Sequence, residues 1–351
     1  MDEIQLLDAT GHEPIDRVLR GLVGVFETAF PGRVRGYYVE GSHASDTAVA
    51  ASDLDLTIVF KGSFQAGHDN DEEERERAAR LTASYSAASA VECDAEIVDE
   101  EGLRRGVYPA FKLASRLVYG DDVRDEVPLL PLDEWTRQRM HAACWLIVGL
   151  YRRPLPLRLP IDYPDPVGAF YGYDHRPARL PDGRTVPTTR DLIRVVGWAA
   201  TALVALRAGR YVARKRDCHV LYRASIGDEW ADLLDDIDAR CRGECGYLVP
   251  DDPHERRELR DICARALGFE NHFLHLHREF VRRELQEGMR EGRLGALWLL
   301  ARVPHQDEAI LDAVRALVGS DGEDDEVMRG AAREALGAMQ GPERMMEVGT
   351  A

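Results

Sequence analysis

The chain has 351 residues, enough to bury a full hydrophobic core and to fold into two or three domains. Its formal net charge of −17 argues against a nucleic-acid-binding protein, which normally carries a basic stripe, but it permits a cationic ligand. No apolar run approaches the roughly eighteen residues of a membrane span, and the acidic N-terminus lacks a signal-peptide pattern, so we expect a cytoplasmic protein that does not contact membranes.

Helical and strand patterns alternate in the first third of the chain. Apolar side chains recur at helical spacing in residues 12–30, and Pro31-Gly32 ends that helix. We expect strands at 34–40, 54–60 and 91–98 and further helices at 72–88 and 108–118. These elements predict a small mixed β-sheet flanked by helices over residues 1–125.

After residue 132 the pattern becomes helical. A proline-rich stretch at 153–190 interrupts it, and Asp182-Gly183 has the composition of a hairpin turn. We expect helices at 133–152, 190–208, 216–224, 228–241, 254–268 and 270–288. The pattern of residues 126–288 therefore predicts an all-α domain. Together with the mixed sheet of the first third, we expect the fold class of the chain to be α+β.

The C-terminal residues 289–351 differ from the domain before them. Helices are expected at 309–317 and 327–337, and this pattern resembles the second helix of a HEAT repeat. Such repeats bury their apolar faces only against neighbours. We therefore expect a HEAT-like extension that packs on the helical domain or binds a protein partner.

The most informative segment is residues 41–55, GSHASDTAVAASDLD. A Gly-Ser turn follows one apolar run, and Asp53-Leu54-Asp55 opens the next. Because side chains alternate along a strand, Asp53 and Asp55 share a face. Two carboxylates there require a balancing cation, and Mg²⁺ takes oxygen ligands. Gly41 and Ser42 let the backbone approach a phosphate closely, so the segment predicts a phosphate cradle beside a metal site.

A third acidic run follows at residues 91–98, where Glu92, Asp94 and Glu96 alternate on one strand face. Together with the Gly-Ser turn and the Asp-x-Asp pair, it resembles the nucleotidyltransferase superfamily of DNA polymerase β. The resemblance implies two Mg²⁺ ions, held by the Asp-x-Asp pair and a third acid that also takes the proton of the attacking hydroxyl. Asp94 matches that third acid, and Glu96 is the second choice.

One position departs from that family. Its turn usually has a second glycine four residues after the serine, where this chain has Asp46. An aspartate near a triphosphate repels it unless the side chain faces solvent or a metal.

A further resemblance covers the back half of the chain. Residues 191–194 and 206–215, followed by Trp230-x₂-Leu233, are similar to the helical C-terminal domain of streptomycin/spectinomycin-type aminoglycoside adenylyltransferases. With the front motif, the resemblance covers about residues 30–270. It implies that Arg214 or Lys215 reaches the triphosphate and that Asp191 lies near an amine-bearing substrate. An arginine that the family carries within the preceding helix is replaced here by Thr201.

These features predict a Mg²⁺-dependent enzyme that transfers AMP from ATP to a hydroxyl of a small, cationic, aminoglycoside-like molecule. The expected nucleotide-binding residues are Gly41, Ser42, Ser52, Arg214 and Lys215. The expected acceptor-binding residues are Asp165, Tyr171 and Asp191, through ion pairs and cation–π contacts. Two alternatives remain open: a protein or RNA acceptor, or an inactive nucleotide-binding regulator.

Cysteines and histidines form no recognisable metal-binding spacing. The set Cys241, Cys245, His254 and Cys263 is not spaced as a standard zinc site, and the six scattered cysteines indicate reduced thiols. We interpret the group at His272, His275 and His277 as a partly buried helix face.

Overall fold

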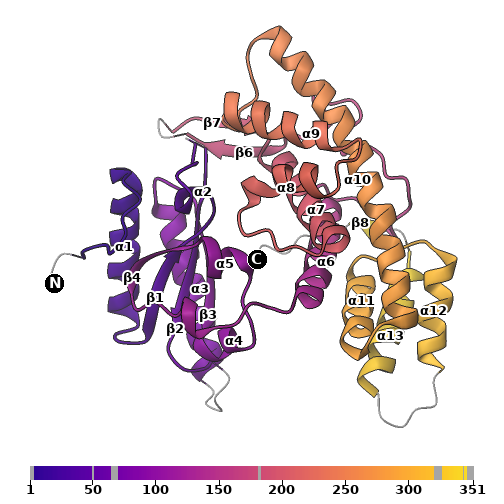
Figure 1. Cartoon of the computed structure of the whole chain (residues 1–351), viewed down its shortest axis with the longest axis horizontal. Coiled ribbons are helices and arrows are strands. Elements are labelled where there is room, and N and C mark those ends of the chain that lie inside the picture. Colours follow the sequence, from indigo (N-terminus) through magenta and orange to yellow (C-terminus); the bar gives the residue numbers. More distant parts are fainter. Residues whose placement is uncertain are drawn as a thin grey trace. The chain divides into compact units, whose positions relative to one another are not determined.

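The computed structural model describes residues 4–49, 51–64, 70–180, 183–319, 326–342 and 344–345. The chain forms two compact units (Figure 1). The front unit comprises Met1–Leu132, Arg179–Thr185 and Tyr211–Asp217, and the helical unit comprises Asp133–Ala178, Val186–Arg210 and Cys218–Ala351. None of the described helices is both long enough and apolar enough to cross a membrane.

A four-stranded mixed sheet in the order β3-β2-β1-β4 is the centre of the front unit (Figure 1). Strand β1 is antiparallel to β2 and to β4, whereas β2 and β3 are parallel. The strands are β1 Val34–Val39, β2 Leu54–Phe60, β3 Cys93–Asp99 and β4 Arg116–Gly120. The helices are α1 Glu13–Ala29, α2 Gly41–Ala44, α3 Asn70–Ala88, α4 Glu100–Arg104 and α5 Pro109–Ala114.

The two faces of this sheet are covered differently. On one face, α1 and α3 pack apolar side chains such as Phe26 and Ala78 on the inward residues of the strands, in keeping with the apolar stripe of α1. On the other face, Leu103 and Phe111 pack against Tyr38 and other apolar residues. This second face also carries the polar residues of β2 and β3, and we call it the polar face.

Strand β4 corrects the helix that we expected at 108–118. Helix α5 ends at Ala114, Ser115 is extended, and the chain returns to the sheet as an edge strand. Leu117 and Tyr119 pair with β1. Residues 117–119, Leu-Val-Tyr, suit a pleated surface better than a helix, and the neighbouring strand satisfies their backbone groups.

The helical unit is built mainly from α6 to α13. Its helices are α6 Leu132–Leu150, α7 Arg190–Ala208, α8 Cys218–Ser225, α9 Ala231–Asp236, α10 Pro253–Glu287, α11 Arg290–Arg302, α12 Glu308–Val318 and α13 Glu326–Met339. A π-helical segment, Ile237–Glu244, follows α9. Within this unit, α13 packs on α11 and α12, which pack on α10. The proline-rich stretch contains a two-stranded sheet of β6 Arg176–Arg179 and β7 Thr185–Thr188; Asp182 lies outside the described residues.

Helix α10 is continuous, whereas we expected two helices that meet near residue 269. In the structure the helix continues through Gly268, and a Cβ atom there would lie 2.8 Å from Cη2 of Trp230. The glycine therefore makes room for an indole ring.

Candidate metal and nucleotide site

The parallel pairing of β2 with β3 brings the expected metal ligands together. Asp55 lies opposite Asp94, and Thr57 lies opposite Glu96. Side chains that are opposed on neighbouring strands leave the same face, about 5 Å apart. Asp55 is half-buried, while Asp94 and Glu96 are exposed. Asp53 directly precedes β2. The polar face therefore carries a row of carboxylates along two adjacent strands.

Glu40 belongs to the same group of carboxylates, and sequence reasoning missed it. Its backbone N–H donates to the Asp55 carbonyl at 2.9 Å, and its carboxylate accepts a hydrogen bond from the Thr57 hydroxyl. Burial raises the pKa of Glu40 to about 7, the charges of Glu96 and Asp55 add to the increase, and Lys215 opposes it. The strand alternation that places Glu40 on the same face as Tyr38 was the one available signal.

Gly41 is the residue on which the close packing of this turn depends. Its φ is +63°, in the left-handed region that favours glycine, and a Cβ atom there would overlap Oδ2 of Asp55. Glu40 is the N-cap residue of α2 and makes no side-chain cap hydrogen bond. Because Gly41 has no side chain, its backbone lies directly against Asp55, a candidate metal ligand.

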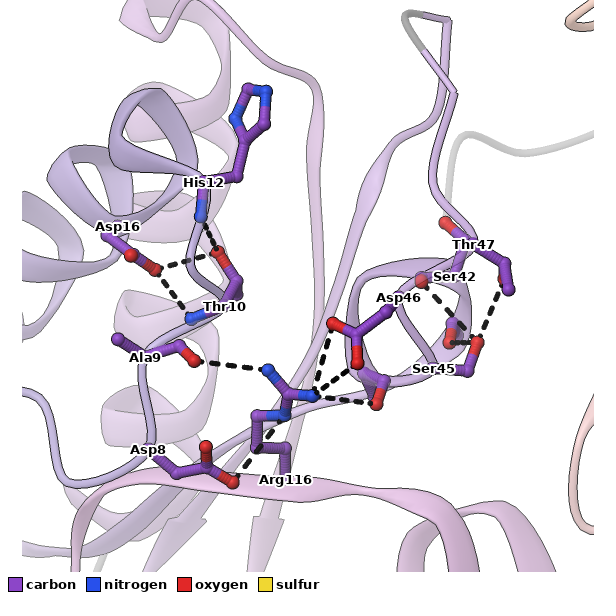
Figure 2. A network of polar contacts seen from close by, with 12 residues as sticks. Asp8, Ala9, Thr10, His12, Asp16, Ser42, Ser45, Asp46, Thr47 and Arg116 are labelled. Atoms are coloured by element: carbon purple, nitrogen blue, oxygen red, sulfur yellow. Dashed lines mark hydrogen bonds and ion pairs between the residues drawn. The ribbon is translucent and has the colours of Figure 1, made fainter.

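The turn after α2 explains how the chain accommodates Asp46 (Figure 2). Asp46 has φ of +54°, the conformation for which a glycine would be favoured. Its carboxylate pairs with Nη2 of Arg116 at 3.1 Å, and Nε of Arg116 lies 3.5 Å from Asp8. The hydroxyl of Ser45 donates to the Gly41 carbonyl at 3.0 Å, which closes the turn. Asp46 therefore has a cationic partner within the front unit, Arg116, which it shares with Asp8.

The remaining nucleotide-site candidates occupy two different settings. Ser52 is buried and closes a loop with Val49, whose N–H donates to the Ser52 hydroxyl at 3.0 Å. Arg214 and Lys215 lie in Tyr211–Asp217, which belongs to the front unit, and the Tyr211 hydroxyl donates to the Leu130 carbonyl at 2.5 Å. The charge of Lys215 acts on Glu40, so this lysine lies near the carboxylate row.

A cavity of about 310 Å³ in the front unit begins beside the carboxylate row. Its lining contains two arginines, Arg75 from α3 and Arg105 from the turn after α4. Neither forms an ion pair with another described residue. Residues that line it include Thr57, Glu96, Arg75, Arg105, Tyr108 and Phe111.

The three expected acceptor-binding residues lie in the helical unit, and each is engaged there. Asp191 forms an ion pair with Arg176 at 3.3 Å. The ring of Tyr171 stacks on Tyr163 with centroids 4.2 Å apart, and the guanidinium of Arg260 lies 4.1 Å from its centroid. The Asp165 carboxylate accepts a hydrogen bond from the Val167 N–H at 3.2 Å, and its N–H donates to the Tyr171 carbonyl.

No model of a known protein family matches the chain, and no curated protein is significantly similar to it in sequence.

Proposed function

We propose that the chain is a Mg²⁺-dependent nucleotidyltransferase that transfers AMP from ATP to a hydroxyl group. The observation that carries this proposal is the opposition of Asp55 and Asp94 on the polar face, directly beside the backbone of Gly41. Carboxylate oxygens at this spacing suit hard divalent cations. The backbone of Gly41, at positive φ and without a side chain, suits the close approach of a phosphate oxygen.

The residues of the front unit would have separate roles in such a reaction. Asp53, Asp55 and Asp94 would hold Mg²⁺, which when bound stabilises charge on the attacking and leaving oxygens. Asp94 is the exposed member of the opposed pair, and it accepts the proton of the acceptor hydroxyl. The hydroxyl oxygen bonds to the α-phosphorus as the bond to the pyrophosphate oxygen breaks. Lys215 supplies positive charge near the row of acids.

Binding and turnover of ATP test this proposal. We expect a non-hydrolysable ATP analogue to bind the wild-type protein only when Mg²⁺ is present. Asp55→Ala should abolish this Mg²⁺-dependent binding. Asp125→Asn, an exposed acid of the same unit outside the site, is the matched control. Wild-type protein that fails to bind the analogue with Mg²⁺, or an Asp55→Ala variant with full turnover, would contradict the proposal.

The acceptor that we expect from the acidic net charge is a small cationic, aminoglycoside-like molecule. Streptomycin, spectinomycin and kanamycin should then give a calorimetric signal with the ATP analogue and Mg²⁺, and high salt should weaken it. Asp165→Asn and Asp191→Asn should reduce the signal. No heat with any of the three compounds would remove this acceptor class.

A second acceptor class is favoured by the cavity beside Glu96. Two arginines without ion-pair partners among the described residues suit a phosphate or carboxylate group. An acceptor with both an anionic group and a hydroxyl could place that hydroxyl near Asp94, which lies two residues before Glu96 on the same face of β3. Sugar phosphates and hydroxy acids should then release pyrophosphate from ATP, and the double variant Arg75→Ala, Arg105→Ala should raise their KM without changing the affinity for the ATP analogue.

A further inference from the structure

Three residues of metal-binding types, one cysteine and two histidines, converge in the interior of the helical unit. Cys144 comes from α6, His277 from α10, and His305 from the connection between α11 and α12. One donor atom from each lies within 4.8 Å of the other two, and all three side chains are buried. Among the described residues this is the one such group of histidines, cysteines and acids.

Three of the four histidine nitrogens in this cluster lack hydrogen-bond partners. His305 is 1 % exposed, and neither of its ring nitrogens has a partner; His277 is fully buried, and its Nδ1 has none. A buried polar atom without a partner costs about 1–3 kcal/mol. Three such atoms in one cluster are therefore expensive unless something binds them.

The surroundings prepare these nitrogens for metal binding. Nε2 of His277 lies 3.3 Å from Nδ1 of His141. If His277 donates in that hydrogen bond, its Nδ1 is left as the acceptor, which is the usual arrangement for a histidine ligand and its outer partner.

We propose that Cys144, His277 and His305 bind one Zn²⁺ ion. Zinc favours this combination of thiolate and imidazole ligands. Tetrahedral Zn–S and Zn–N bonds place donor atoms about 3.5 Å apart, so donor atoms that lie within 4.8 Å of one another need to close by about 1.3 Å at most. On binding, the Cys144 thiol loses its proton to solvent, and His141 holds the ring of His277. The ion would connect α6, α10 and the loop before α12, and this role is independent of nucleotidyl transfer.

Metal content and the spectrum of a cobalt-substituted protein test the site. We expect one zinc per chain that survives dialysis, and a near-ultraviolet sulfur-to-cobalt charge-transfer band when Co²⁺ replaces it. The carboxylates of the front unit cannot produce that band. Cys144→Ser should abolish the band, and zinc should raise the Tm of wild type but not of this variant.

Matched controls separate the site from general effects of core substitution. Cys263→Ser and His272→Gln alter residues of α10 outside the cluster and should keep both the zinc and the band. His305→Gln provides a second loss variant should Cys144→Ser not fold. Wild-type protein that binds no zinc after reconstitution under reducing conditions would overturn the proposal. So would a cobalt–thiolate band that persists in Cys144→Ser or disappears in Cys263→Ser.

Discussion

Gly41 and Asp55 are packed so closely that a Cβ atom on residue 41 would overlap the Asp55 carboxylate. The positive φ of Gly41 adds a second constraint, because a non-glycine residue there costs about 1–2 kcal/mol. The position of Asp55 therefore depends on the absence of a side chain fourteen residues earlier in the chain.

Gly41→Ala should accordingly reduce transfer by about 100-fold, because the new methyl group displaces Asp55 from the metal-binding position. Steady-state kinetics with Mg²⁺ and ATP would measure the loss. Gly24→Ala is the control, since a Cβ atom at Gly24 in α1 meets nothing within 4 Å and should leave turnover unchanged. An active Gly41→Ala variant would show that Asp55 tolerates the displacement.

Asp94→Asn should retain binding of the ATP analogue but lose about 10²–10⁴-fold in transfer, because an amide cannot accept the hydroxyl proton. Glu96→Gln should lose less, because Glu96 lies opposite Thr57 rather than Asp55. Single-turnover measurements on both variants would compare them. If Glu96→Gln is dead and Asp94→Asn is active, the roles of the two acids are reversed.

Arg116→Ala should weaken ATP binding by exposing the phosphate turn to the unpaired charge of Asp46. The pair is largely solvated on the Asp46 side, so the expected change is on the order of 1 kcal/mol, about fivefold in affinity. Asp46→Gly should restore affinity in the double variant, since it removes the charge and suits the positive φ. Asp8→Asn, on the other side of Arg116, should have no effect. A double variant as weak as Arg116→Ala would exclude this electrostatic explanation.

Glu270 should make the stability of the protein depend on pH. It pairs with Arg153 at 2.8 Å, both side chains are almost completely buried, and burial raises the pKa of Glu270 from 4.5 to about 7. Between those values the native chain holds a proton that the unfolded chain has lost. The free energy of unfolding therefore falls as pH rises through this range, by about 3 kcal/mol for a fully buried group.

Urea unfolding of wild type and Glu270→Gln between pH 4.5 and 7.5 would isolate this contribution. The free energy of unfolding of wild type minus that of Glu270→Gln should decrease as pH rises. A difference that stays constant would mean that Glu270 is ionised throughout the range.

Local sequence patterns predicted most elements of the front unit. The strands at 34–40 and 54–60 and the helix at 12–30 match β1, β2 and α1 within one residue at each end. Strand β3 begins two residues later than expected, and β4 was wrongly assigned to a helix. The mixed α+β class follows from these patterns, because helical and strand periodicities are properties of neighbouring residues.

The sequence alone predicted the strand that carries Asp55 and the Asp-x-Asp pair at its start, because alternation along a strand is local. Only the tertiary structure decided that Asp94 lies opposite Asp55, because strand order and register depend on contacts between segments far apart in the chain. The same holds for Cys144, His277 and His305, which no sequence spacing connects and which meet only because three separate segments pack around one point.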